Sequence, residues 1–494
     1  MRKEQTEDTR KTVGNLSSTF LIRFARYPFL AIYIVTIPRM LGAANYGKLA
    51  FIISILMLAA EVLTFGIPRV FGRFIPEYIL NDEYQKVERL VSAYFVFEFI
   101  IGIILAVASV ILFFSINQLK NEIFSIIFLY LALISEVFSS ILFSVLFGLN
   151  YVGKSNSVNL FRTVFRLILF LILYPIFGFT GVLFSLFLTP LFSSLYAFYS
   201  IRKVFKFQLR KPVIKEFIPK LKFGIVIFTP TLLFLFQQQI GPAFLKSFSL
   251  SNSEVGFFDL ANQGFLVIYG LAITGFETLI PISSKFQVTG KQKKSIDWLF
   301  TLLRYILPIL IIIIVGFYLF GKLLIAKILG NQFVSIYPIA LIILLSTPIW
   351  LIGQLGYVRS VVLSKPRPYF ISSLLSTMVF ILAGIFFINK LGAIGLAITI
   401  VLSAITYSAN ISYLYKEVLH VLGAIIKKFS PSLILFLPII LFSFENIGIR
   451  ILVFLISIFL FLGLLIKLKI INMNELKEIS FAFRKKIPID NTLG

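Results

Sequence analysis

The sequence predicts an all-α integral membrane protein, and three observations support that prediction. Of its 494 residues, 59% are hydrophobic, including 57 phenylalanines, and only 14% are charged. The mean hydropathy is +0.98. A soluble fold could not hide this much apolar surface from water, since soluble domains carry about 25% charged residues. The apolar residues also fall into long continuous runs, which must be helical in lipid because no other partner is available for the backbone.

Fourteen apolar runs predict about fourteen transmembrane helices. They cover residues 14–37, 46–67, 90–116, 123–147, 156–177, 180–200, 223–244, 255–283, 296–320, 334–356, 368–388, 392–415, 431–444 and 449–470. The thirteenth run is short. Continuous runs exclude a transmembrane β-barrel, whose strands alternate polar and apolar residues over about ten positions.

The distribution of Lys and Arg predicts the orientation of these helices. A net charge of +25 would indicate nucleic-acid binding in a soluble protein. With both termini in the cytoplasm, however, 33 of the 46 basic residues fall on the cytoplasmic side, 8 fall outside and 5 lie within spans. Because cytoplasmic loops of membrane proteins are enriched in Lys and Arg, we expect cytoplasmic N- and C-termini and no role in nucleic-acid binding.

The sequence also contains an internal repeat. Gly47 before the second span matches Gly256 before the eighth at an offset of 209 residues, and the motif from Gly178 to Gly181 matches that from Gly392 to Gly395 at an offset of 214. Two repeated lobes joined by a basic linker are typical of transporters. The predicted parts are an N-terminal tail (1–13), an N-lobe of six helices (14–200), a basic cytoplasmic linker (201–222), a C-lobe of six helices (223–415), two further helices (416–470) and a C-terminal tail (471–494).

Motifs for catalysis, cofactors and metals are weak. Residues 148–155 match the phosphate-binding loop G-x-x-x-x-G-K-S, but they fall in a short turn between two spans, where a nucleotide-binding domain has no room. The absence of Cys excludes disulfides and thiolate metal sites. We therefore expect no enzyme activity, catalytic residue, cofactor, metal or bound nucleotide.

Five arginines within the spans are the candidate substrate-binding residues, because intramembrane charge is costly and is usually functional. Arg23 and Arg26 share a face of the first helix, Arg162 and Arg166 share a face of the fifth, and Arg304 lies in the ninth. Arginine stays charged and binds phosphate oxygens in a bidentate manner. The two pairs therefore suit a dianion or a pyrophosphate.

Other polar residues within the spans leave a structural alternative open. Glu61, Glu98 and Glu136 could pair with the arginines and simply hold the helices together, and Asp259 and Glu277 are further candidates for ion coupling or structural pairing. Three adjacent glutamines begin at residue 237 in the seventh helix, and at least one should face the bundle interior. We therefore add Gln237 and Gln238 to the residues expected to line a cavity.

The sequence resembles the polysaccharide-biosynthesis flippases of the multidrug/oligosaccharidyl-lipid/polysaccharide (MOP) exporter superfamily, which also contains the MATE transporters. The stretch from Arg39 to Gly47, followed by an apolar span and the motif from Gly66 to Arg69, is similar to their opening repeat. The stretch from Leu329 to Phe333, with the later turn at Lys365, is similar to their second half. The motifs are loose, and the resemblance extends over nearly the whole chain at the level of topology.

This resemblance implies two six-helix lobes, two extra C-terminal helices and a cationic central cavity. The implied function is to flip an undecaprenyl-pyrophosphate-linked oligosaccharide across the bacterial cytoplasmic (inner) membrane for O-antigen, capsule or exopolysaccharide synthesis. Its implied partners are this lipid, membrane lipids and other polysaccharide-assembly proteins. The alternatives are a multidrug or cation exporter of the same superfamily, a flippase for the peptidoglycan lipid precursor and, in a different class, a membrane sugar polymerase.

Overall fold

The computed structural model of the chain is built from helices. It describes residues 2–115, 123–205, 208, 210–211, 213–288, 292–363, 365–419, 423, 429, 431–432, 434–436, 446–468 and 470. The α-helices are α1 (Arg2–Leu63), α2 (Ile67–Leu80), α3 (Tyr84–Ser115), α4 (Ile123–Gly148), α5 (Val152–Val204), α6 (Ile214–Gln239), α7 (Gly241–Ser247), α8 (Asn252–Val288), α9 (Gln292–Ile328), α10 (Ile336–Leu345), α11 (Thr347–Val362), α12 (Pro366–Leu414) and α15 (Ile447–Lys467). Two short 3₁₀ helices, η2 (Asn331–Phe333) and η3 (Ile434–Phe436), complete the set, and no strand occurs in these ranges.

The expected membrane-spanning helices are present. Nine helical segments of the described chain are long and apolar enough to cross a membrane. Three of them lie in α1, α5 and α12, and each of these helices is interrupted by one glycine with a non-helical backbone, so each has room for two passes. Most of the predicted span 431–444 lies outside the described residues, so the count of fourteen stays a prediction.

The interrupting glycines explain how one long helix becomes two antiparallel ones. Gly178 and Gly392 have φ of 58° each, with ψ of −139° and −133°, in a region that side chains with a Cβ rarely enter. A Cβ on Gly181 or on Gly395 would lie 2.1 Å from the carbonyl oxygen eight residues earlier. The two turns that the sequence matches at an offset of 214 therefore also share their backbone geometry.

Two segments between predicted spans form helix that the hydropathy pattern did not predict. The segment 67–80 forms helix α2, with Pro68 in its first turn and Ile67, Val70, Phe71 and Ile75 on its buried face. Helix α6 begins at Ile214, inside the predicted linker 201–222, and ends at Gln239. The hydropathy pattern missed both because these helical segments carry too many charged residues to count as spans.

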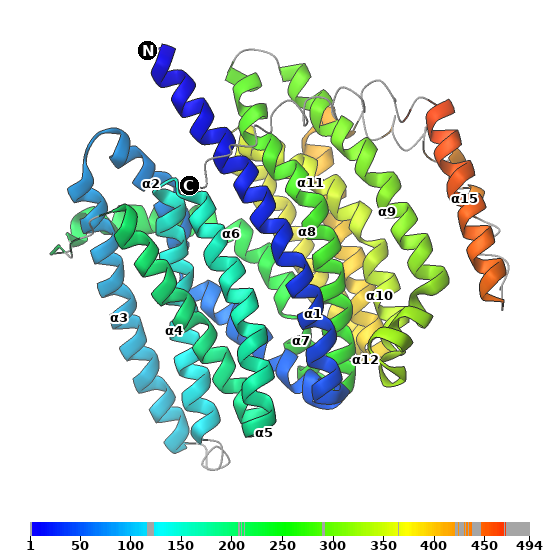
Figure 1. Ribbon diagram of the computed structural model, residues 1–494, viewed down its shortest axis with the longest axis horizontal. Coiled ribbons are helices and arrows are strands. Elements are labelled where there is room, and N and C mark those ends of the chain that lie inside the picture. The colour runs from blue at the N-terminus through cyan, green and yellow to red at the C-terminus, as the bar shows by residue number, and fades with distance from the viewer. Residues whose placement is uncertain are drawn as a thin grey trace, which may run out of the picture. The chain divides into compact units, whose positions relative to one another are not determined.

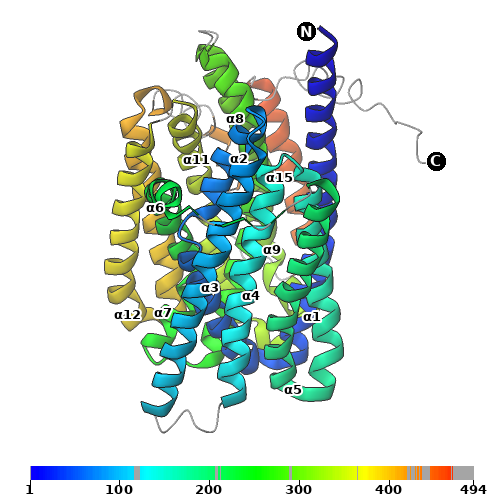
Figure 2. The ribbon, with the colours of Figure 1, turned by 90° about the vertical axis from the view of Figure 1, so that its left-hand side faces the viewer.

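The chain divides into two compact units. Unit 1 comprises 1–263 with 384–396, and unit 2 comprises 264–383 with 397–494. In unit 1, helix α4 packs against α5, α1 and α2, and Figures 1 and 2 show α3, α4 and α5 running side by side. In unit 2, helix α9 packs against α10, α11 and α15.

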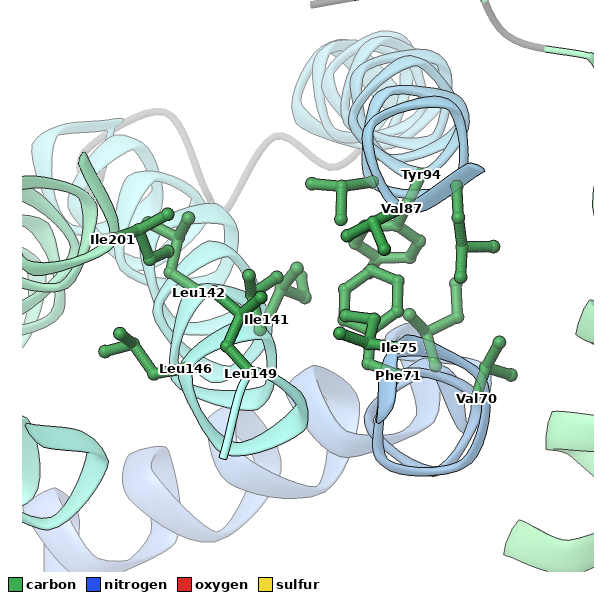
Figure 3. Packing of buried hydrophobic residues seen from close by; sticks show 14 of the residues in the cluster. Val70, Phe71, Ile75, Val87, Tyr94, Ile141, Leu142, Leu146, Leu149 and Ile201 are labelled. Atoms are coloured by element: carbon green, nitrogen blue, oxygen red, sulfur yellow. The ribbon is translucent and has the colours of Figure 1, made fainter. Parts of the chain in front are cut away.

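The core of unit 1 lies where α2, α3 and α4 meet. Phe71 of α2 and Tyr94 of α3 are both buried and pack edge to face, with ring centroids 5.6 Å apart. Ile141 and Leu142 of α4 and Ile201 of α5 belong to the same cluster (Figure 3). This packing fixes α4, which contributes residues to both cavities described below.

Candidate functional site

Three of the predicted arginines come together in unit 1, where α1 meets α5. Arg26 of α1 donates from Nε to the Thr163 hydroxyl of α5 at 3.0 Å. Thr163 lies between Arg162 and Arg166 in the sequence, so the contact brings Arg26 to the helix segment that carries both α5 arginines. The side chain of Arg23 lies outside the described residues, and its place at this site stays a prediction.

Arg162 is engaged by a carboxylate of a neighbouring helix. Its Nη2 contacts the two carboxylate oxygens of Glu136 in α4 at 2.5 and 2.6 Å. The Glu136 side chain is 9% exposed and that of Arg162 is 22% exposed. A buried pair of this kind is costly to break from one side, because the remaining charge stays desolvated. Arg162 is thus ion-paired with Glu136 in the structure.

Arg166 differs from Arg162 in having unfilled hydrogen-bonding capacity. Its Nε and Nη2 atoms are buried and have no hydrogen-bond partner among the residues that the structure describes. The guanidinium carbon lies 6.0 Å from the centre of the Tyr33 ring of α1. Nε and Nη2 form the side edge of a guanidinium, which binds two oxygens of one carboxylate or phosphate group. An unfilled edge of this kind is suited to an anion.

Beside these arginines lies a cavity of about 230 Å³, which we call the polar cavity. Its charged lining residues are Glu61, Glu136 and Arg162. Its other lining residues are Met57, Leu58, Ala60, Thr64, Ser139, Ser140, Phe143, Val158, Asn159, Leu235 and Gln239. The cavity is thus enclosed by α1, α4, α5 and α6, and hydroxyl and amide groups surround its carboxylates.

A second cavity of about 500 Å³, which we call the basic cavity, shares Phe143 with the first. Arg69 and Arg73 of α2 line it, together with Pro68, Gly72, Phe143, Ser144, Phe147, Phe223 and Ile227. Arg73 forms an exposed ion pair with Glu77 at 2.6 Å. The residues of α4 that line the two cavities lie on one face of that helix, and so do those of α6, since they recur at three- and four-residue spacing or its multiples.

The remaining acidic candidates lie elsewhere. Glu98 accepts a hydrogen bond from Tyr94 on the same helix at 2.5 Å and lines neither cavity. Asp259 of α8 accepts one from Tyr46 of α1 at 2.6 Å, within unit 1. The side chain of Glu277 lies outside the described residues.

The other predicted polar residues are also dispersed. Gln237 and Gln238 are buried, and it is the next residue, Gln239, that lines the polar cavity. Arg304 belongs to unit 2, where its guanidinium carbon lies 5.4 Å from the centre of the Tyr305 ring. The serines of α4 and Asn159 were not predicted, although their three- and four-residue spacing from Glu136 and Arg162 is visible in the sequence.

The segment that matches a phosphate-binding loop, 148–155, joins the end of α4 to the start of α5, and no strand precedes it. A Cβ on Gly148 would lie 2.8 Å from the Phe71 carbonyl, so this glycine serves close packing of α2 on α4. The Lys154 ammonium lies 5.2 Å from the centre of the Tyr151 ring. Within the described part of the chain, no group of three or more His, Cys, Asp or Glu side chains is placed to hold a metal.

Solved structures with the same fold are transporters. The chain is similar to the lipid II flippase MurJ in an inward closed conformation, with a TM-score of 0.71, 17% identity and coverage of 91% of this chain and 99% of that one. It is similar to an inward-facing multidrug resistance MATE transporter of the MOP superfamily, with a TM-score of 0.63, 14% identity and coverage of 84% and 99%. A mutant of the Vibrio cholerae MATE transporter VcmN gives a TM-score of 0.56 at 14% identity, covering 82% and 98%.

The family follows from the sequence comparison. No curated protein matches the chain. The family model described as "Polysaccharide biosynthesis protein" matches residues 12–287, more than half of the chain, and this range contains both cavities and the arginines of α1 and α5. The chain therefore belongs to the polysaccharide biosynthesis protein family and has the helical membrane fold of the MOP superfamily transporters.

Proposed function

We propose that this protein flips an undecaprenyl-pyrophosphate-linked oligosaccharide across the bacterial cytoplasmic membrane by alternating access. A polyprenyl pyrophosphate carries its charge at the junction between the sugar and the lipid tail. Moving that charge through the membrane requires a basic, water-accessible path, because unpaired charge in hydrocarbon is costly. Family membership in polysaccharide biosynthesis and the flippase fold both support a substrate of this kind.

The observation that carries the proposal is the unfilled edge of Arg166. Among the described residues the buried Nε and Nη2 of Arg166 have no partner, and an anion would offset the free-energy cost of their desolvation. Arg26, which contacts Thr163 of α5, adds positive charge, and Arg162, which is paired with Glu136 of α4, supplies a further guanidinium for a pyrophosphate with two phosphoryl groups. We assign Arg166 the bidentate contact to one phosphoryl group and Arg26 and Arg162 the stabilisation of the other.

A binding measurement on the purified protein tests this assignment. Arg166→Ala should weaken the binding of undecaprenyl pyrophosphate about 10- to 100-fold, since a charged hydrogen-bonded contact contributes roughly 1.5–3 kcal/mol. Arg166→Lys should recover only part of the loss, because an ammonium lacks the two-donor edge. Undecaprenyl monophosphate should bind less tightly than the pyrophosphate and be less sensitive to Arg26→Ala.

Arg202→Ala is the matched control, since Arg202 is an exposed arginine at the end of the same helix. It should leave binding unchanged. Equal affinities for the wild type and for Arg166→Ala would refute the pyrophosphate site.

The second candidate substrate is a peptidoglycan lipid precursor, because the fold is similar to that of the lipid II flippase MurJ. Both substrates offer the same pyrophosphate to the arginines, so the site alone favours neither. The family match to polysaccharide biosynthesis favours the oligosaccharide. Loss of surface polysaccharide with normal growth in a deletion strain would support the first substrate, and arrested cell-wall synthesis would support the second.

A further inference from the structure

The basic cavity combines positive charge with exposed apolar walls. Arg69 and Arg73 of α2 line it about one helical turn apart, and no carboxylate belongs to the described residues of its lining. The cavity is open to the protein surface, where Phe147 of α4 is 50% exposed and Ile227 of α6 is 39% exposed. A water-soluble anion needs the charge but gains little from exposed apolar walls. The combination therefore fits a ligand that is both anionic and apolar.

The basic cavity lies at the level of one membrane surface. Helix α4 is long and apolar enough to cross a membrane, and it ends at Gly148. Its lining residues from Phe143 to Phe147 fall in the last two turns, and the exposed residues Asn150 and Tyr151 follow. Because the last turns of a spanning helix reach the lipid headgroups, the phosphates of bilayer lipids lie at this depth. The distribution of Lys and Arg predicts that this side is cytoplasmic.

The charges around the basic cavity leave a positive surplus. Arg73 pairs with Glu77, but both side chains are exposed, and exposed ion pairs contribute little stability. Glu61 of α1 is near enough to attract Arg69 electrostatically. Lys220 of α6 lies against two aromatic rings of α2 and adds a third cation. Three cations and two carboxylates leave one positive charge, which matches a monoanionic phosphodiester better than a pyrophosphate.

We propose that the basic cavity binds the phosphodiester headgroup of one anionic glycerophospholipid of the bilayer. Arg69 and Arg73 contact the phosphate oxygens, as arginine does in other phosphate sites. A volume of about 500 Å³ holds the headgroup and the first methylenes of its chains but no oligosaccharide, and the chains continue past Phe147 and Ile227 into lipid. Basic pockets between transmembrane helices bind anionic lipid headgroups in other membrane proteins.

A lipid in this cavity joins α2 to α6, both of which belong to unit 1. The two helices already touch beside the cavity, since a Cβ on Gly66 would lie 2.5 Å from the Gly224 carbonyl oxygen. The guanidinium carbon of Arg69 also lies 5.9 Å from the centre of the Phe228 ring of α6. A ligand that binds the folded protein alone stabilises it. The bound phospholipid should therefore raise the thermal midpoint.

Binding is measured on the full-length purified protein in detergent, with fluorescent phosphatidylglycerol as the probe. We expect saturable binding of one phosphatidylglycerol per chain, a raised thermal midpoint, and weaker binding of phosphatidylcholine, whose headgroup has no net charge. Arg69→Ala should weaken phosphatidylglycerol binding at least about 10-fold, as expected for the loss of a hydrogen bond to a charged group. Arg202→Ala, at an exposed arginine of α5 that lines neither cavity, is the matched control and should bind as the wild type does.

A second variant separates a lipid in the cavity from attraction to the basic surface in general. Gly72 lines the cavity, and a Cβ there would meet no atom within 4 Å. Gly72→Leu thus fills the cavity and keeps every charge, and leucine favours helix more than glycine does, so the fold is retained. This variant should lose saturable binding, whereas Gly264→Leu, at a glycine of α8 that lines neither cavity, should not. Equal phosphatidylglycerol affinities for the wild type and Gly72→Leu would overturn the site.

Two competitors identify the source of the phosphate. Glycerophosphoglycerol is the same headgroup without acyl chains and should compete poorly, so competition as strong as that of phosphatidylglycerol would overturn the lipid assignment. Undecaprenyl pyrophosphate should leave the bound phosphatidylglycerol in place, and displacement that Arg69→Ala prevents would assign the cavity to the transported lipid instead. The phospholipid measurement uses no transported lipid. Loss of pyrophosphate binding at Arg166 would therefore refute the proposed function and leave the phospholipid site standing.

Discussion

Tyr46 and Asp259 are 213 positions apart in the sequence, yet the Tyr46 hydroxyl donates to the Asp259 carboxylate at 2.6 Å. Both lie in unit 1, and Tyr46 is 7% exposed. A carboxylate inside a membrane protein needs such donors, because water is scarce there. The sequence identified Asp259 as a candidate for pairing or coupling, but its partner could not be predicted, since hydropathy does not determine how far each helix is rotated about its axis.

We predict that Tyr46→Phe lowers the stability of the protein, because it leaves a desolvated carboxylate short of one donor at a cost of about 1–3 kcal/mol. The thermal midpoint of the purified protein should fall, and the double variant with Asp259→Asn should recover part of the loss. Tyr199→Phe, at a 55% exposed tyrosine of unit 1, is the control and should not shift the midpoint. Equal midpoints for the two single Phe variants would contradict a stabilising role for this hydrogen bond.

The partners of Arg162 and Arg166 could not be predicted from the sequence either. Their spacing predicts correctly that Arg162 and Arg166 share a face of α5, because four residues make about one helical turn. Helix α4 places Glu136 against Arg162, whereas the Nε and Nη2 atoms of Arg166 have no hydrogen-bond partner in the part of the chain that the structure describes. Which arginine is ion-paired depends on how three helices pack together. The spacing of residues along one helix does not determine that packing.

Equivalent positions of the internal repeat contact each other where α1 packs against α8. A Cβ on Gly47 would lie 1.6 Å from the Asn252 carbonyl oxygen, and a Cβ on Gly256 would lie 2.9 Å from the Ala43 carbonyl oxygen. The offset of 209 that relates Gly47 to Gly256 also relates Ala43 to Asn252. The contact is therefore reciprocal, and glycine is needed at both positions because the two backbones touch. The sequence predicted the repeat, but not that its equivalent positions meet.

We predict that Gly47→Ala separates α1 from α8 and destabilises the protein by about 1–3 kcal/mol or more, since the added methyl overlaps a backbone oxygen that cannot turn aside. The thermal midpoint and the yield of monodisperse protein measure the effect. Gly264→Ala is the matched control, because a Cβ at that helical glycine meets nothing within 4 Å. An unchanged midpoint for Gly47→Ala would show that the crossing is not close in solution.

At the scale of the whole molecule, composition and the fourteen apolar runs predicted the fold class, because the demand for backbone hydrogen bonds in lipid leaves few alternatives. The helical fold and its likeness to the MOP transporters confirm that class. Helix α2, which lines the basic cavity, and the early start of α6 were missed. If the predicted orientation holds, most of the basic residues behind the net charge of +25 lie in cytoplasmic loops, and the role of the few arginines inside the spans stays a proposal.

A flipping assay in proteoliposomes tests whether the protein moves a pyrophosphate-linked oligosaccharide lipid between leaflets. Vesicles carry undecaprenyl-pyrophosphate oligosaccharide with a fluorophore on the sugar, and a membrane-impermeant reductant bleaches whatever reaches the outer leaflet. We predict that the wild-type protein exposes the label of both leaflets to the reductant. Vesicles with Arg166→Ala, like protein-free ones, should lose only the outer-leaflet signal. Identical bleaching with the wild-type protein and without protein would contradict this prediction.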